Sequence, residues 1–162
     1  MQQIIFILLA LGTLGAAIMV VTSQNLMRSA LWLILAFFGI AGIFVMLDAE
    51  FLAVTQILIY VGAIAMLIIF AIMLTRGMMD PKQPRFNQQW GVVGGFAALL
   101  FVVLTVLVTR NTWPVAVAAV PPDTIMQLGR DFVGPYVVPF EVASVLLVVA
   151  MIGAIIVARE RE

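Results

Sequence analysis

Five long stretches of this sequence contain no charged residue, and they limit the folds that are open to it. These stretches are residues 1–27, 29–47, 51–75, 86–109 and 142–158. An α-helix needs about 20 apolar residues to cross the roughly 30 Å hydrocarbon core of a bilayer. We therefore predict an all-α integral membrane protein with five transmembrane helices in a single multi-pass domain over residues 1–162. The predicted spans are about 4–22, 29–47, 51–75, 90–109 and 139–158.

The composition excludes several classes of protein. Hydrophobic residues make up 65% of the chain and charged residues only 10%, whereas a soluble domain has about 25% charged residues. The formal net charge is zero, so no basic surface for nucleic acid is expected. Because Cys and His are both absent, the chain lacks the usual ligands of zinc, haem and iron–sulfur clusters. We expect it to bind no metal or redox cofactor itself.

Prolines and glycines separate the last two predicted spans. Five of the seven prolines fall between Arg110 and Pro139, which predicts a long loop over residues 110–138. Pro139 is well placed near a helix start, and Glu141 is then expected in the first turn, close to the positive end of the helix dipole. The N-terminal Met-Gln-Gln has no basic character, so we expect the first span to be retained rather than cleaved as a signal peptide.

The distribution of basic residues predicts the orientation. If the N-terminus lies outside, six of the eight basic residues lie on the inner side: Arg28, Arg76, Lys82, Arg85, Arg159 and Arg161. Arg110 and Arg130 then lie outside, together with the loop 110–138. Since cytoplasmic segments are enriched in Lys and Arg, we predict an outer N-terminus and a cytoplasmic C-terminus in the plasma membrane of a bacterium.

Polar residues interrupt the apolar span over 51–75. Gln56 and Tyr60 are four residues apart and share a side of a helix. Tyr60 lies about 15 Å below Glu50, near the bilayer midplane, whereas tyrosine usually prefers the interface. One interpretation is an interhelical hydrogen bond, with Gly62 allowing close packing. The other is a π-bulge, a one-residue insertion in the helical ladder that often marks a functional site.

Two carboxylates have two interpretations each. Glu50, like Asp48, lies at a membrane boundary, where it is either a solvated interfacial acid or part of a proton path. Glu141 is either a charge near a helix N-terminus or, at membrane depth, a group that relays protons or pairs with a partner.

Glycines in the predicted spans indicate close helix packing. In the first two spans these are Gly12, Gly15, Gly39 and Gly42, together with Ala16. Gly91 and Gly95 form a small-xxx-small pair in the fourth span. Such residues let helix backbones approach each other in a membrane.

Two blocks of the sequence resemble a known family. The run Thr55-Gln56-Ile57-Leu58-Ile59-Tyr60-Val61-Gly62-Ala63-Ile64 is similar to the third helix of subunit J of the proton-translocating NADH-quinone oxidoreductase, complex I. The block from Tyr136 to Ala158, with Pro139-Phe140-Glu141-Val142-Ala143-Ser144, is similar to the last helix of that subunit. The length and the five-helix layout match as well.

The resemblance implies a core subunit of the membrane arm that has no redox role of its own. Other membrane and hydrophilic subunits would be its partners, and those partners would hold FMN, the iron–sulfur clusters and the quinone. In the family, a π-bulge lies at the positions of Tyr60, Val61 and Gly62, and its conversion to regular helix accompanies a change between resting and active forms. The stretch would therefore gate a hydrated proton path. Gln56, Glu50 and Glu141 are candidates for contacts with this path or with partner subunits, and the resemblance itself assigns Glu50 no role.

Two other classes of function stay open at this point. One is a plain helical scaffold with no coupling role, which would tolerate any conservative change in the span 51–75, and the other is a transport subunit. Multisubunit cation/proton antiporters have subunits that are distantly related to those of complex I. A subunit of such an antiporter would have its ion path at Glu50 or Glu141 and would show no dependence on NADH.

Overall fold

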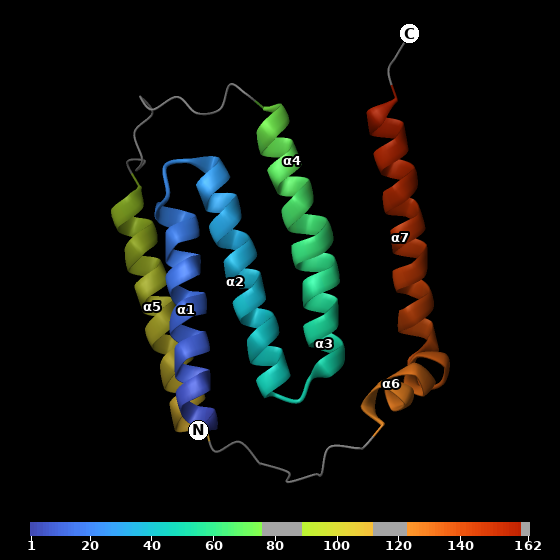
Figure 1. Ribbon diagram of the computed structural model, residues 1–162, viewed down its shortest axis with the longest axis horizontal. Helices are drawn as coiled ribbons and strands as arrows, with labels where there is room; N and C mark the ends of the chain where they lie inside the picture. Colours follow the sequence, from blue (N-terminus) through green and yellow to red (C-terminus); the bar gives the residue numbers. More distant parts are fainter. Residues whose placement is uncertain (76–88, 112–122, 160–162) are drawn as a thin grey trace. The chain divides into compact units, whose positions relative to one another are not determined.

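The computed structural model describes residues 1–75, 89–111 and 123–159, and all of its regular elements are helical. The first part contains α1 (Gln2–Thr22), α2 (Leu26–Met46), α3 (Glu50–Thr55), the π-helix η1 (Gln56–Ala65) and α4 (Met66–Leu74). It is followed by α5 (Trp90–Arg110), α6 (Thr124–Val133) and α7 (Val137–Ala158) (Figure 1). The contacts divide the chain into two compact units, Met1–Val117 and Ala118–Glu162.

Five helices of the described residues are long and apolar enough to cross a membrane. They are α1, α2, the continuous helix α3–η1–α4 over Glu50–Leu74, α5 and α7. Each has 21 to 25 residues, which at about 1.5 Å per residue spans the hydrocarbon core. The prediction of an all-α membrane protein with five spanning helices is confirmed. Four of the basic residues used to predict the orientation, Arg76, Lys82, Arg85 and Arg161, lie outside the described residues.

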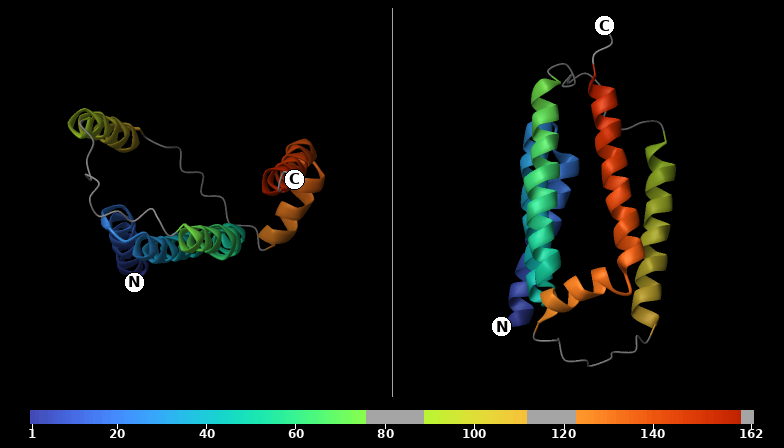
Figure 2. Two further views of the ribbon diagram at one scale, coloured as in Figure 1. Left: turned by 90° about the horizontal axis from the view of Figure 1, so that it is seen from above. Right: turned by 90° about the vertical axis from the view of Figure 1, so that its right-hand side faces the viewer.

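In the first unit, α2 packs against α1 on one side and against α3, η1 and α4 on the other (Figures 1 and 2). The buried residues of these helices are almost all alanines: Ala16, Ala30, Ala36, Ala41, Ala53 and Ala65. In lipid there is no hydrophobic force between helices, so association depends on close van der Waals contact, which small side chains allow.

Two glycines of α2 contact α1. A Cβ atom at Gly39 would collide with Thr13, and one at Gly42 would come within 3.2 Å of Leu9 Cδ2. The predicted packing role of both glycines is therefore confirmed. In contrast, a Cβ at Gly12, Gly15, Gly91 or Gly95 would meet no described atom within 4 Å, so those glycines are not needed for packing among the described residues.

Local hydrogen bonds fix both ends of α2. At its start, Asn25 Oδ1 accepts from the backbone N–H groups of Met27 (3.0 Å) and Arg28 (3.3 Å), which is the usual action of an N-cap asparagine. At its end, Asp48 N–H donates to the Val45 carbonyl and Ala49 N–H to the Phe44 carbonyl. This pair of bonds is the Schellman motif, which requires a left-handed residue. Asp48 supplies it, with φ 54°.

The second unit contains a short helix that the sequence did not reveal. The connection 110–138, which we predicted as a loop, includes α6 over Thr124–Val133. The Phe132 ring of α6 stacks on Phe140 of α7, with centroids 5.8 Å apart. With only 10 residues and a polar side, α6 is too short and too mixed to stand out as a charge-free stretch.

The last spanning helix begins at Val137, two residues before the predicted start. Pro139 therefore lies in the first turn, where a backbone N–H has no partner within the helix and none is lost. Glu141 is then the fifth residue of α7 and lies beyond the first turn. The prediction that Glu141 lies in the first turn is wrong.

Candidate functional site

The spanning helix over Glu50–Leu74 changes its hydrogen-bond pattern near its middle. Residues Gln56–Ala65 form the π-helix η1, and regular α-helix precedes and follows it. The three predicted gating residues, Tyr60, Val61 and Gly62, all lie inside η1. Long π-helices are rare, and π-turns within α-helices are frequent at functional sites. The predicted departure from α-geometry in this helix is confirmed.

The burial pattern shows where the extra residue is accommodated. Ala53, Gln56 and Ala65 are buried, and between Gln56 and Ala65 only Val61 is half-buried, whereas the other residues are exposed. The intervals along this buried stripe are therefore three, five and four residues. A regular α-helix repeats a side after three or four residues, whereas π hydrogen bonds join residues five apart. The interval of five, from Gln56 to Val61, is the packing signature of the π-turn.

Tyr60 connects η1 to the neighbouring helix. Its ring meets Phe37 of α2 edge to face, with centroids 5.4 Å apart and planes at 73°. The Tyr60 side chain keeps 43% of its surface exposed, and its hydroxyl donates no hydrogen bond to any described residue. The interhelical hydrogen bond that we considered for Tyr60 is thus not formed within the described part of this chain.

Gln56 is a buried polar group inside the bundle. It retains only 6% of its surface and is the one polar residue buried among those described. None of the hydrogen bonds among the described residues involves its side chain amide. No fully buried side-chain nitrogen or oxygen among the described residues lacks a hydrogen-bond partner, so the amide atoms of Gln56 keep some contact with the surface of the chain. A water molecule or a polar group of another subunit can therefore reach this amide, and a polar group at membrane depth needs such a partner.

Gly62 fits the π-turn without being required by it. A Cβ atom at Gly62 would lie 3.4 Å from the Ile57 carbonyl oxygen, five residues earlier, and would meet no other atom within 4 Å. This is an ordinary van der Waals distance. A small side chain can therefore occupy the position in the present conformation.

The two acidic candidates lie apart from η1 along the chain. Glu50 is the first residue of α3 and is exposed, at a helix end where the dipole stabilises a carboxylate. Glu141 belongs to the second unit, where its side chain is exposed. Ser144, one turn further along α7, donates its hydroxyl hydrogen to the Phe140 carbonyl (3.0 Å) and so bonds within its own helix.

One contact of the site was not predicted from the sequence. Phe37 is one of 11 phenylalanines, and nothing in the sequence distinguishes it from the other ten. Its partner lies 23 positions away, and no periodic pattern in either helix marks the pair.

Comparison with known proteins agrees with this architecture. Residues 16–157 match the family model of NADH-ubiquinone/plastoquinone oxidoreductase chain 6. The chain is 39% identical to an NAD(P)H-quinone oxidoreductase chain 6 from Synechocystis sp., over 98% of this chain and 81% of the relative. It is 37% identical to F(420)H(2) dehydrogenase subunit J from Methanosarcina mazei, over 98% and 92%. A chloroplastic NAD(P)H-quinone oxidoreductase subunit 6 from Mesostigma viride is 34% identical, over 99% and 86%.

These matches cover nearly the whole chain at more than 30% identity. The chain therefore belongs to the NADH-ubiquinone/plastoquinone oxidoreductase chain 6 family.

Proposed function

We propose that this chain is a core subunit in the membrane arm of a quinone-reducing, proton-translocating NADH dehydrogenase of the complex I type. The names of its relatives support membership of such a complex. In this proposal FMN, the iron–sulfur clusters and the quinone are bound by other subunits. This chain, which has no Cys or His, contributes a conformational element and no redox group.

The electron donor is set by the partner subunits. Relatives named for NAD(P)H and for F(420)H(2) are 39% and 37% identical to the chain, over almost its full length. Relatives named for two chemically different electron donors are thus about equally similar to this chain. This supports a role for the chain on the quinone and proton side of the complex.

The single observation that carries the gating proposal is the π-helix over Gln56–Ala65. Removing the extra residue from the ladder would turn this segment into α-helix and rotate everything beyond it by about 100°. In the α form, residues four apart share a side. Tyr60 would then take the place beside Gln56 that Val61 occupies in the π form.

This exchange changes the chemistry next to the side-chain amide of Gln56. Val61 presents only methyl groups beside Gln56, whereas Tyr60 presents a hydroxyl that can both donate and accept a hydrogen bond. A water chain next to Gln56 would be interrupted in one form and continued in the other. The subunit would thus gate a proton path between acidic groups of its partners, with Glu50 and Glu141 as further contacts, and no group on η1 would need to titrate.

Deletion of Leu58 tests this proposal. Leu58 is 65% exposed within η1, and removing it shortens the interval between Gln56 and Val61 from five residues to four. The helix can then be α throughout while its buried stripe stays in register. We expect the complex to assemble but to lose coupled turnover, because η1 can no longer change form.

A second deletion serves as a matched control. Leu67 in α4 is similarly exposed, at 69%, but its removal leaves η1 intact and rotates the rest of α4 by about 100°. We expect this variant to assemble poorly, because it holds Ile68, Ile69 and Ile72 out of the stripe of the π form permanently, whereas the proposed change of η1 is reversible. NADH-driven quinone reduction and acidification of membrane vesicles are the readouts. An assembled Leu58 deletion that pumps at the wild-type rate would contradict the gating role.

A further inference from the structure

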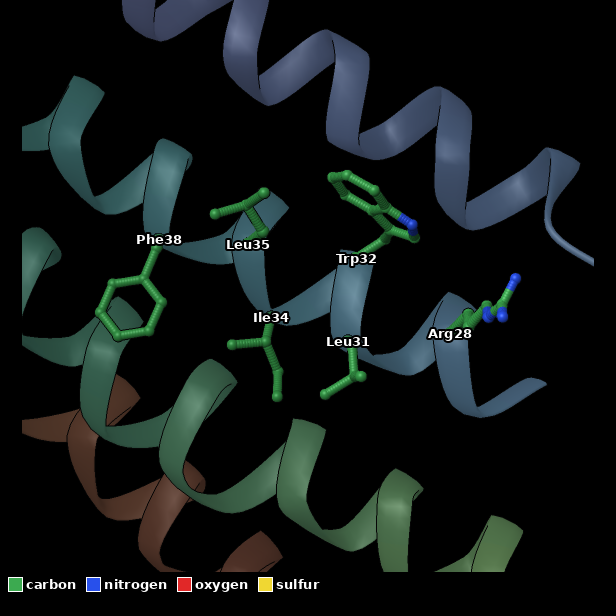
Figure 3. Close-up of a pocket in the computed structure, with 6 residues that line it drawn as sticks. All are labelled: Arg28, Leu31, Trp32, Ile34, Leu35 and Phe38. Carbon is green, nitrogen blue, oxygen red and sulfur yellow. The ribbon is translucent and has the colours of Figure 1, made fainter. Parts of the chain in front are cut away.

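The face of α2 carries an open groove that the proposed gate does not use. It has a volume of about 470 Å³. Its lining residues all come from α2: Arg28, Leu31, Trp32, Ile34, Leu35 and Phe38 (Figure 3). Five of these side chains are apolar, and the single cation lies at one end of the row.

The apolar part of the groove is accessible from outside the chain. Leu31, Leu35 and Phe38 keep 55%, 51% and 48% of their surface exposed. They lie at intervals of four and three residues, so they follow one side of the helix. An occupant that matches this surface is a long, flexible hydrocarbon.

The cation at the end of the groove has no counter-charge among residues 1–75, 89–111 and 123–159. Arg28 is exposed, and none of the described acidic side chains forms an ion pair with it. It is the sole basic residue in positions 1–75. The acids of this region, Asp48 and Glu50, lie at the opposite end of α2.

The length of the groove matches one leaflet of a bilayer. Arg28 and Phe38 are ten residues apart on a continuous helix, a distance of about 15 Å along its axis. That is half of the roughly 30 Å hydrocarbon core. Arg28 is the third residue of α2, which places it near the membrane boundary, and Trp32 follows one turn deeper, where aromatic rings of interfacial belts are found.

We propose that this groove binds an anionic phospholipid. The lipid phosphate contacts the Arg28 guanidinium, which suits phosphate oxygens in a bidentate geometry. One acyl chain lies along Leu31, Leu35 and Phe38. A net-negative headgroup is preferred over a zwitterionic one, because no acid in the described part of the chain pairs with Arg28 and a zwitterionic headgroup brings its own cation. This site does not depend on the gating proposal.

Photolabelling of the intact complex tests the site. The assembled complex is placed in nanodiscs that contain phosphatidylglycerol with a photoreactive group on one acyl chain, and the labelled peptides of this subunit are mapped. We expect labelling within residues 31–38. In the Arg28→Gln variant it should fall by about tenfold, the factor expected for loss of a hydrogen bond to a charged group. Arg28→Lys, which keeps the charge, should retain most of the labelling.

Two controls make the result specific. Arg110→Gln changes the exposed cation in the last turn of α5 and should leave labelling of residues 31–38 unchanged. Photoreactive phosphatidylcholine should label these residues weakly and without dependence on Arg28. Equal labelling by both lipids, or labelling by phosphatidylglycerol that is unaffected in Arg28→Gln, would overturn the proposal. Absence of any label on residues 31–38 would also overturn it and would indicate that a partner subunit covers the groove.

Discussion

The Tyr60 ring of the π-helix packs edge to face on Phe37 of α2, with the ring centroids 5.4 Å apart. Such an aromatic pair contributes about 0.5–1.5 kcal/mol beyond the area that it buries. The contact joins the middle of η1 to the helix that lies between α1 and α3–η1–α4. A change of η1 from π to α would move Tyr60 relative to Phe37, so this pair reports on the state of the helix.

Replacing Tyr60 by Phe removes the hydroxyl group and keeps the aromatic ring. The ring contact with Phe37 is kept, and the hydroxyl has no partner among the described residues, so assembly and thermal stability should not change. If the hydroxyl continues the water chain in the α form, coupled turnover should fall by about tenfold, the effect of losing about 1.4 kcal/mol in the transition state. The chain offers a matched control in its other tyrosine, Tyr136, which is 58% exposed. Equal rates of NADH-driven proton uptake in Tyr60→Phe and Tyr136→Phe would remove the hydroxyl from the mechanism.

The contact between Gly39 and Thr13 sets the distance between α1 and α2. Gly39→Ala places a methyl group where Thr13 already lies, and overpacking of this kind costs about 1–3 kcal/mol. We expect a lower temperature for dissociation of the subunit from the detergent-solubilised complex. Gly12→Ala is the control, because its added methyl group meets no described atom. Equal thermal stability of the two variants would show that the helices do not pack as described.

The turn between α2 and α3 depends on the left-handed backbone of Asp48. Non-glycine residues pay about 1–2 kcal/mol for this conformation, and β-branched residues tolerate it least. Asp48→Gly should therefore keep or slightly raise stability, whereas Asp48→Val should lower it, as measured by proteolysis of this turn in membranes. Asp48→Asn retains a residue type that accepts left-handed backbone and removes the charge. A loss of turnover in Asp48→Asn at unchanged stability would assign the carboxylate a functional role that we do not propose.

The proposed orientation of the chain in the membrane can be tested by labelling single introduced cysteines, because the sequence contains no native cysteine. Leu47 lies at the end of α2 and Gln24 before its start, and both are exposed. With an outer N-terminus, an impermeant maleimide added to intact cells should label Leu47→Cys, while Gln24→Cys should react only after permeabilisation. The opposite pattern would reverse the proposed topology, with the C-terminus then outside.

Much of the fold follows from the sequence because membrane spans are long and leave a strong signal. Charge-free stretches gave all five spanning helices, since a charge in hydrocarbon is costly and a span needs about 20 residues. Helix α6 was missed because ten amphipathic residues leave no such signal. The early start of α7 was missed because Pro139 fits the third position of a helix as well as the first.

The site was only partly accessible to sequence reasoning. Gln56 and Tyr60 drew attention because polar side chains are rare in a span, and the π-turn was one of two interpretations of that anomaly. The five-residue interval between Gln56 and Val61 on the inward side of the helix favours the π-turn. The sequence does not show which side of the helix faces α2, so this interval could not be recognised from it. The Phe37–Tyr60 contact and the groove beside Arg28 depend on how two helices pack, which periodicity within either helix does not determine.

The hydrogen-bond register of residues 56–65 in the whole complex is the most direct test of the gating proposal. Structures of the complex at rest and during turnover should resolve whether each backbone N–H in this segment bonds four or five residues back. We predict π geometry in one state and α geometry in the other, with Tyr60 leaving its present contact with Phe37 to lie beside Gln56. The same π register in both states, with Tyr60 still on Phe37, would contradict a gate built from this helix.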